Sequence, residues 1–468
     1  MNSAPHLGFA TEIVRADVIA RYKDLQGFDV FFNTGTDEHG QKIFEAAEKE
    51  GIEPQVFANQ ASDKFKSLLE ILSIWPKVNF IKTTDGGHIK AAQEFWRQCK
   101  ERGWITKKNY TVKYCVGCEL EKTDSELENG HCPLHPNREI ELISEENYFF
   151  RFSSFQEQLL NFYKDNPDFV VPKERFHEID AFVSRGLEDF SISRLKSKMS
   201  WGIAVPDDSD HVMYVWFDAL VNYIAAIGWP DDIPRFKKYW EESGGVVQYC
   251  GKDNLRQQAA MFQAMLMSVG LKPSRHIVID GFILGEGGKK MSKSIGNVVD
   301  PVALVDEYGV DAVRYYILRE LHPFEDSEFT LEKFRDAYNA NLANGLGNLV
   351  SRIMKLAESY LVEPVRKPNI EGTYPQELEN YFDQFNFNLA LDHIWGGIQA
   401  LDQRLNIEEP FKIVKENKIK GEEIIRALVE GLYVIAYELE PFLPNTSTDI
   451  KSAILSNKKP KNLFPRKP

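Results

Sequence analysis

The fold of this chain is constrained most by a repeated order of a short apolar run, a turn rich in glycine and charged residues, and a helical pattern. Residues 29–33 form one apolar run, the turn Thr34-Gly35-Thr36-Asp37-Glu38-His39-Gly40 follows, and a helix is predicted from about Gln41. Apolar runs that end in such turns recur at 246–250 and 277–280. Strands that alternate with helices favour an open, mostly parallel sheet. Ligands of such sheets bind beyond the carboxyl ends of the strands, so these turns are the predicted ligand-binding segments.

The turn after the third run has the composition of a polyphosphate-binding loop. Residues 281–294 read GFILGEGGKKMSKS, with glycines ahead of Lys289, Lys290 and Lys293. Glycine lets the backbone bend, lysine supplies a point charge and serine supplies hydroxyl donors. Such a loop can also be simple solvated surface, so the interpretation needs partner segments.

One partner segment lies near the start of the chain. Pro5-His6-Leu7-Gly8 precedes apolar residues that recur every four positions, at Ala10, Val14, Val18 and Tyr22, which predicts an amphipathic helix. A helix N-terminus favours an anion, because its amide groups are unpaired and its dipole is positive there. His6 could instead only cap the helix.

Asp253, directly after the run at 246–250, is placed to accept hydrogen bonds from ribose hydroxyls.

Four residues in a polar, turn-rich segment have the spacing of zinc ligands. Cys115 and Cys118 form a CxxC pair, and after thirteen intervening residues Cys132 and His135 form a CxxH pair. Thiolate and imidazole ligands at this spacing close a tetrahedral site, so we predict one structural Zn²⁺ per chain. Cys99 and Cys250 are predicted to be ordinary buried thiols.

The length and net charge of the chain limit the number of domains and the kinds of partner. The 468 residues suffice for two to four domains, and the net charge of −14 argues against non-specific binding to nucleic acid. No segment has the length and apolarity of a membrane span, and we expect a cytoplasmic protein. From about residue 300 the apolar spacing is helical, which predicts a helix bundle. The basic last eighteen residues are expected to fray.

The motifs together resemble those of class I aminoacyl-tRNA synthetases. Pro5-His6-Leu7-Gly8 and Lys290-Met291-Ser292-Lys293-Ser294 are similar to the two signatures of that class. The turn at 34–40, the zinc pairs, residues 214–218 and Gly345-Leu-Gly-Asn-Leu-Val-Ser-Arg352 narrow the resemblance to the methionyl-tRNA synthetase family, along essentially the whole chain. It implies ATP-dependent ligation of L-methionine to tRNA(Met) through a methionyl-adenylate, with release of AMP and pyrophosphate.

The resemblance also implies an architecture. It is a Rossmann-like parallel-sheet catalytic domain with a zinc-binding insertion, followed by an all-α anticodon-binding bundle. The catalytic domain would occupy 1–106 and 201–289, and the connective insertion 107–200. The lysine-motif loop and stem-contact region would occupy 290–335, and the anticodon-binding domain 336–468. No further tRNA-binding or dimerisation domain is expected, so a monomer is predicted.

Roles for single residues follow from the same resemblance. Catalytic and ATP-binding roles fall on His6, Lys290 and Lys293, and further ATP contacts on Gly8, Gly251 and Asp253. Asp37 would bind the substrate ammonium, and Trp216, Ala219, Tyr223 and Gln258 would form the methionine pocket. Arg194 matches a family arginine near the site, although a surface salt bridge would explain it equally. Asn348, Arg352 and Phe411 would read the anticodon of tRNA(Met). ATP would carry Mg²⁺.

The sequence departs from the family pattern in places. The family has a strand before the Pro5–Gly8 signature, so we expect the native start to lie upstream of Met1. Phe9 stands where the family usually has a second histidine, Gln258 replaces a histidine, Phe262 replaces a tryptophan, and Phe411 replaces a tryptophan.

These departures leave alternatives open. One is a truncated or catalytically impaired paralogue that only binds tRNA, although a pure binder has no need of the lysines at 290 and 293. Another is a class I ligase for a branched aliphatic amino acid or for cysteine. The former would need a larger editing insertion, and the latter uses zinc in the core rather than in an insertion.

Overall fold

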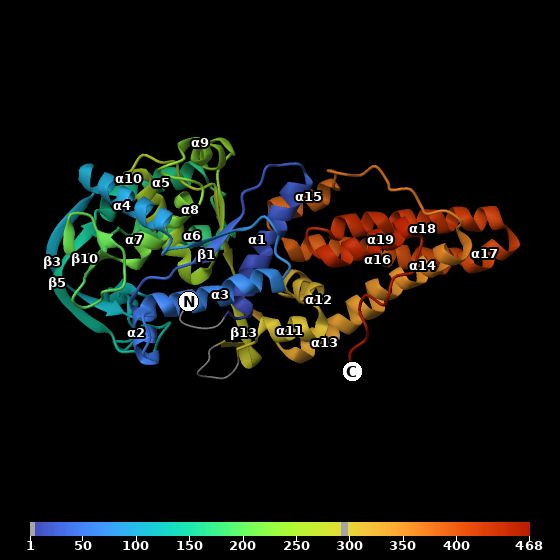
Figure 1. Ribbon diagram of the computed structural model, residues 1–468, viewed down its shortest axis with the longest axis horizontal. Coiled ribbons are helices and arrows are strands. Elements are labelled where there is room, and N and C mark those ends of the chain that lie inside the picture. Colours follow the sequence, from blue (N-terminus) through green and yellow to red (C-terminus); the bar gives the residue numbers. More distant parts are fainter. Residues whose placement is uncertain (1–4, 292–297) are drawn as a thin grey trace. The chain divides into compact units, whose positions relative to one another are not determined.

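The computed structural model describes residues 5–291 and 298–468, and they form a mixed α/β protein with a helical C-terminal part (Figure 1). The chain divides into two compact units. Unit 1 contains Asn33–Ser67 and Val78–Ile279, and unit 2 contains His6–Phe32, Leu68–Lys77 and Asp280–Pro468. The predicted fold class is confirmed. The five-part functional division stays a prediction.

The strands of unit 1 include the predicted parallel pairs. β1 (Asn33–Thr36) pairs in parallel with β2 (Asn79–Lys82). β12 (His276–Asp280) lies between β11 (Val247–Gly251) and β6 (Val170–Val171), and it runs parallel to β6. The helix predicted from about Gln41 is present as α2 (Gln41–Glu50). The helices that follow it in this part of the chain include α3 (Pro54–Ile71), α4 (Gly86–Glu101), α5 (Gln156–Asp165) and α6 (Lys173–Ser184).

Two predicted strands are wrong in extent. Residues 29–32, predicted as part of a strand, have no regular structure, and β1 begins only at Asn33, because the polar residues 33–36 are the ones that meet β2. Gly35 permits this approach, since a Cβ there would lie 2.0 Å from the carbonyl oxygen of Ile81. The second is the stretch 211–218, whose apolar composition predicts a strand through Asp218, whereas β10 (Asp208–Met213) ends at Met213. There the backbone N–H groups of Phe217 and Asp218 bond to the carbonyl of Tyr214 and form α7 (Val215–Ala219).

The insertion in unit 1 is built on an antiparallel sheet of order β4-β3-β5-β7. β3 (Ile105–Cys115) and β5 (Glu141–Phe150) pair from Ile105↔Phe150 to Tyr114↔Glu141. The cysteine-bearing segment therefore joins one end of β3 to the adjoining end of β5. The remaining strands are β4 (Leu120–Lys122), β7 (Phe190–Ser191), β8 (Ser193–Leu195) and β9 (Ala204–Val205).

Unit 2 begins with α1 (Leu7–Leu25), whose predicted apolar face is buried. Arg15 on this helix donates to the carbonyls of Leu321, His322 and Pro323 and pairs with Asp280 at 3.1 Å. Asp17 pairs with the buried Arg314 at 2.7 Å. These buried ion pairs fix the first helix of the chain to segments about 300 residues later.

The glycine–lysine segment is more ordered than a simple loop as far as residue 290. β13 (Ile283–Gly285) and β14 (Lys289–Lys290) form a hairpin, and Gly287 and Gly288 adopt the positive φ values of 74° and 71° in its turn. β13 also pairs in parallel with β15 (Ser327–Glu328).

The rest of unit 2 is helical, as predicted. α14, α16, α18 and α19 run side by side in the bundle (Figure 1). The bounds are α11 (Pro301–Tyr308), α12 (Val310–Tyr315), α13 (Leu331–Ala337), α14 (Asn348–Tyr360), α15 (Gln376–Asp383), α16 (Phe387–Glu408), α17 (Pro410–Glu416), α18 (Lys418–Leu439) and α19 (Pro444–Ser456). Among the described residues, every helix is too short or too polar to cross a bilayer.

The basic tail does not fray, contrary to the prediction. Phe464 is buried, and the Tyr338 hydroxyl donates to the carbonyl of Pro465 at 2.8 Å. Asn339 donates to the carbonyl of Lys467 and accepts from its N–H, both at 2.9 Å. One buried ring and three hydrogen bonds offset the entropy of ordering this segment.

Candidate active site and metal centre

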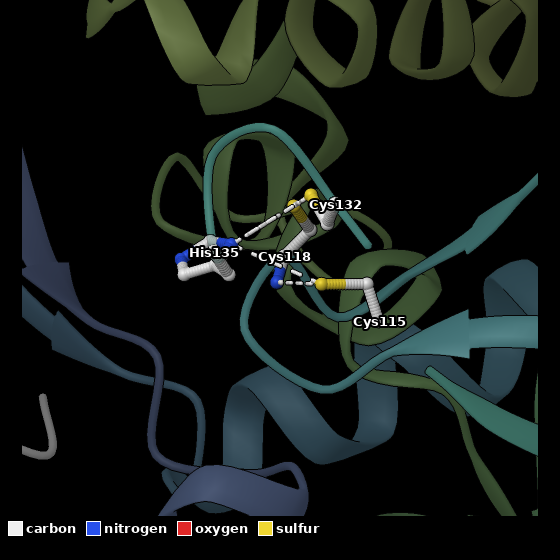
Figure 2. Close-up of side chains that lie close together, drawn as sticks. All are labelled: Cys115, Cys118, Cys132 and His135. Carbon is white, nitrogen blue, oxygen red and sulfur yellow. Dashed lines mark hydrogen bonds between the residues drawn. The ribbon is translucent and has the colours of Figure 1, made fainter. Parts of the chain in front are cut away.

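The four predicted zinc ligands converge. Their side chains point toward one another from the end of β3 and from the turns that follow it (Figure 2). The Cys118 sulfur lies 3.4 Å from the Cys132 sulfur and 3.3 Å from His135 Nδ1, and Cys115 Sγ lies 3.8 Å from the same nitrogen. All four ligand atoms lie within 4.8 Å of one another.

This arrangement fits zinc. A tetrahedron with metal–sulfur bonds of about 2.3 Å has edges of about 3.8 Å, close to the spacings observed. Gly117 is needed for the geometry, because a Cβ at this position would lie 2.3 Å from Cγ of His135. The residues present therefore form a donor set that could hold one metal ion.

The metal centre is also connected to the rest of unit 1. Glu126 closes a capping box with Thr123 in the same segment. Its carboxylate also accepts a hydrogen bond from Arg256 at 2.5 Å. Arg256 lies directly before the helical stretch that carries Gln258. This ion pair links the cysteine segment to a helical stretch that holds a predicted substrate-binding residue.

The turn after β1 carries Asp37 and His39, and it meets a second acid. His39 Nδ1 and His88 Nε2 each lie 2.6 Å from an oxygen of Asp218, one on either side of the carboxylate. All three side chains are buried. Burial alone would lower the pKa of His39, but the charge and hydrogen bond of Asp218 outweigh it and raise that pKa. Burial opposes ionisation of Asp218, yet His39 and His88 lower its pKa below the usual value. The cluster therefore contains an ion pair.

Asp37 itself reaches solvent, so a cationic ligand can approach it. The protein atoms that crowd it nevertheless remove much of its hydration. That loss of water, followed by the negative charge of Asp218, raises the pKa of Asp37 to about 6. An ionised Asp37 is exposed to the negative charge of Asp218, and the ammonium group of a ligand would offset that repulsion.

The predicted side-chain pocket residues lie on consecutive helical turns. Trp216 and Ala219 belong to α7, and Tyr223 belongs to α8 (Asn222–Ala225). Trp216 and Tyr223 are half-buried, whereas Ala219 is buried. The Tyr223 hydroxyl lies 2.7 Å from Gln258 Nε2, and its ring packs against Phe262 at 5.4 Å. The structure thus brings Tyr223 and Gln258 together.

Behind Gln258 lies a buried polar network that the sequence did not reveal. Gln248 donates to Gln258 Oε1 at 3.1 Å, and the Ser274 hydroxyl donates to Gln248 Oε1 at 2.5 Å. Gln263 accepts from the N–H of Ser274 at 2.8 Å and donates to the carbonyl of Gln258 at 2.7 Å. Each of these four side chains is at most 4% exposed. In the sequence, the only indication of this network was the presence of glutamines inside the apolar stretch 257–267.

Gly251 and Asp253 take the positions predicted for them. Gly251 is the last residue of β11, and Asp253 follows in an exposed turn. Arg194 is buried, so it does not serve as a partner in a surface salt bridge. It donates to Ser191 and the Ser193 carbonyl, and its guanidinium lies 4.5 Å from the ring centre of Tyr214. It lines a cavity of about 230 Å³ in unit 1.

Unit 2 carries His6, Gly8 and Lys290. His6 does cap α1, because its Nδ1 accepts from the N–H of Gly8 at 3.1 Å. An imidazole that accepts at Nδ1 bears its proton at Nε2 when neutral, so that nitrogen is a donor. Gly8 permits the close approach, since a Cβ there would lie 2.8 Å from His6 Cε1. Lys290 ends β14, and Lys293 lies outside the described residues.

The predicted anticodon residues lie in the bundle of unit 2. Asn348 and Arg352 share one face of α14, and Asn348 is exposed. Arg352 donates to Asp402 at 2.6 Å and to Asn406 at 2.5 Å, so α16 holds its guanidinium in place. Phe411 stands in the first turn of α17, and its side chain is 41% exposed. An exposed ring on a rigid helix is available for stacking.

Comparison with known proteins identifies the family. The family model described as "tRNA synthetases class I (M)" matches residues 1–141 and 121–354. The methionine–tRNA ligase of Caldanaerobacter subterraneus subsp. tengcongensis is 39% identical, over 94% of this chain and 70% of that protein. The methionine–tRNA ligase of Synechocystis is 38% identical, over 96% of this chain and 87% of the relative.

A solved structure agrees along the full length. It is the Mycobacterium tuberculosis methionyl-tRNA synthetase in complex with methionyl-adenylate, which is 34% identical and superposes with a TM-score of 0.89. The match covers 100% of this chain and 96% of that chain. The chain therefore belongs to the methionyl-tRNA synthetase family of class I.

Proposed function

We propose that this chain ligates L-methionine to tRNA(Met) at the expense of ATP, through a methionyl-adenylate, with release of AMP and pyrophosphate. The observation that carries the proposal is similarity over nearly the whole chain to enzymes named methionine–tRNA ligase, together with a structural match to a relative that holds methionyl-adenylate. In the first step the methionine carboxylate attacks the α-phosphate of ATP. In the second step the terminal ribose of the tRNA attacks the adenylate.

The methionine would be held by residues of unit 1. Asp37 is exposed and feels the negative charge of Asp218, which suits it to the substrate ammonium. Trp216, Ala219, Tyr223 and Gln258 would surround the side chain. Aromatic rings suit a thioether, since sulfur–ring contacts are favourable. Arg194, Asp218, His39 and His88 would support this region through the contacts described above.

The nucleotide would be held by the two signature segments and by the turn after β11. Gly251 and Asp253 would contact the adenosine ribose. His6 Nε2, Gly8 and the N-terminus of α1 would donate to phosphate oxygens, and ATP would arrive as its Mg²⁺ complex. Lys290 and Lys293 would meet the charge that develops on the transferring phosphoryl group and on pyrophosphate. Since no covalent enzyme intermediate is required, positioning and charge stabilisation would supply the rate.

The metal centre would hold one structural Zn²⁺ on Cys115, Cys118, Cys132 and His135. Four protein ligands fill a tetrahedral shell and leave no position for substrate, so the ion would stabilise the segment rather than take part in the reaction. The small segment between β3 and β5 has few apolar residues of its own, and metal binding would supply its folding energy.

The tRNA would be recognised by unit 2. Asn348, Arg352 and Phe411 would contact the unstacked anticodon bases by hydrogen bonding and stacking. Residues 290–335 would contact the stem. We further propose that the protein acts as a monomer in the cytoplasm.

Amino-acid-dependent exchange of pyrophosphate into ATP tests the proposal. Exchange that depends on methionine and on none of the other nineteen amino acids is the expected result. Exchange driven by a branched aliphatic amino acid or by cysteine would contradict the substrate. Binding of tRNA(Met) without any exchange would favour the non-catalytic paralogue. A Lys290→Ala variant with unchanged exchange would contradict the role of the lysine motif.

A further inference from the structure

Asp280 is a buried carboxylate whose charge is balanced by one guanidinium. It is 3% exposed, and two residues separate it from the β13–β14 hairpin that ends in Lys290. Its Oδ1 lies 3.1 Å from Nη1 of Arg15. Among the described residues, no other side chain or backbone group donates a hydrogen bond to either oxygen. Burial raises the pKa of Asp280 to about 6 and Arg15 opposes that rise, so the pair is ionised at pH 7.5.

Arg15 is held in place by the backbone on the other side of the hairpin. Its guanidinium donates to the carbonyls of residues 321–323 at 2.9 to 3.2 Å. The carbonyl of Pro323 also accepts from the N–H of Gly281 at 3.3 Å. Arg15 is therefore connected to the base of the hairpin by two routes, directly through Asp280 and through the carbonyl that it shares with Gly281.

The same helix is bonded to the chain beyond the lysine motif. The N–H of Leu7, the first residue of α1, donates to the carbonyl of Val299 at 3.2 Å. Leu7 lies between His6 and Gly8, which are proposed to contact phosphate. Residues 280 and 299, one before the lysine motif and one after it, are thus both bonded to α1.

A second buried carboxylate on α1 shows what a structural ion pair looks like in this unit. Asp17 accepts from the N–H of Trp75 at 2.6 Å and pairs with Arg314 at 2.7 Å and with Arg21 at 2.8 Å. Asp280 has only Arg15, and a buried ion pair with so few additional bonds is generally no more stable than apolar side chains of the same size. Its contribution is geometric, because a guanidinium and a carboxylate meet in few arrangements.

We propose that Arg15 and Asp280 are positioning residues that fix the β13–β14 hairpin, and Lys290 with it, relative to the phosphate-binding end of α1. The inference rests on the proposed function, in which His6, Gly8 and Lys290 contact the phosphates of ATP. A displacement of about 1 Å between such groups can cost about 100-fold in rate. The two residues act through the hairpin and need no contact with ATP.

The test is Asp280→Asn, which keeps the shape of the side chain and removes its charge. The variant should fold, because Arg15 keeps its three carbonyl partners. We expect kcat for pyrophosphate exchange to fall at least about tenfold with the KM for methionine unchanged, since the contacts that shift are made to the reacting phosphates. Hydrogen–deuterium exchange at the backbone amides of residues 283–290 should become faster, because the hairpin is held less firmly.

Asp17→Asn is the matched control, the same substitution of a buried carboxylate paired through α1. We expect it to lower the melting temperature, because Asp17 has three partners. All variants are assayed well below the lowest melting temperature. There Asp17→Asn should leave kcat and the hydrogen exchange of residues 283–290 unchanged. If it fails to fold, Arg21→Met removes one partner of Asp17 and replaces it as the control.

The possible results separate this inference from the proposed function. An unchanged kcat in Asp280→Asn, equal losses of kcat in both Asp→Asn variants, or unaltered hydrogen exchange of residues 283–290 would overturn the positioning role and leave the ligase activity standing. A wild-type protein without methionine-dependent exchange of pyrophosphate would overturn the proposed function and the effect on rate together. If Asp280→Asn fails to fold, Arg15→Lys keeps the positive charge and loses the planar fork, and an unchanged kcat there would reject the inference.

Discussion

A single methyl group at position 117 should dismantle the metal centre. In Gly117→Ala the new Cβ would lie 2.3 Å from Cγ, 2.6 Å from Cδ2 and 2.7 Å from Nδ1 of His135, whereas ordinary contact begins near 3.4 Å. The imidazole would therefore have to retreat by about 1 Å. Metal–ligand distances tolerate about 0.2 Å, so His135 could no longer reach an ion held by the three thiolates. We expect the affinity for Zn²⁺ to fall at least about 100-fold, or about 2.7 kcal/mol.

The assay is zinc retention during titration with a competing chelator, with the metal content of each chain measured after dialysis. Gly87→Ala is the matched control, because a Cβ there meets nothing within 4 Å and its φ is not positive. The wild-type protein and Gly87→Ala should lose zinc at the same chelator concentration, and Gly117→Ala at a far lower one. If Gly117→Ala held zinc as tightly as the wild-type protein, the four-ligand geometry inferred here would be refuted.

The remaining predictions concern Lys293, Asp37, Phe411 and Arg314. Lys293→Ala should lower kcat for pyrophosphate exchange much more than it raises the KM for methionine; equal effects on both would contradict a role at the transferring phosphoryl group. Because the pKa of Asp37 is raised to about 6, kcat/KM for methionine should fall as the pH drops through that value. The raised pKa also means that an ionised Asp37 destabilises the folded protein relative to the unfolded chain. Asp37→Asn should therefore raise the melting temperature at pH 7.5, and the gain should vanish below about pH 4, where the carboxyl group is protonated in both states. Phe411→Ala should weaken binding of tRNA(Met) about tenfold without changing exchange, as stacking on one base predicts, and reduced exchange would contradict that role. Arg314→Met should cost about 3 kcal/mol in denaturant unfolding, because it removes one of the two cations that pair with the buried Asp17 and the donor to the carbonyls of Pro441 and Phe442. The exposed Arg97→Met should cost little, and similar losses in the two variants would contradict the difference in burial.

The sequence predicted best what periodicity and spacing encode. The four-residue recurrence of Ala10, Val14, Val18 and Tyr22 predicted α1. The CxxC and CxxH pairs predicted the four side chains that converge. Both are local sequence patterns, and each reflects a single physical requirement. Apolar composition did not predict conformation. Residues 30–32 are apolar without being a strand, and β1 is built from polar residues.

Features that depend on distant segments were not predictable. His88, Asp218 and His39 form one cluster from three separate stretches, and no spacing connects them. The network of Gln248, Gln263 and Ser274 likewise joins residues that no sequence spacing connects. The tail was misjudged for a related reason. Its charge and prolines suggested fraying, whereas Phe464 and the hydrogen bonds to Asn339 and Tyr338, more than 120 residues earlier, determine its conformation.

The position of α1 in unit 2 determines when that unit can be completed during translation. Arg15 is bonded to carbonyls of 321–323, and its neighbour Asp17 is paired with Arg314, which itself donates to the carbonyls of Pro441 and Phe442. At about 5–20 residues per second, a ribosome needs about 15–60 s to synthesise the roughly 300 residues that separate these partners. Throughout that time unit 1 can form, while α1 waits for its partners. The nascent chain thus holds the apolar face of α1 exposed until residues 314–323 have been made.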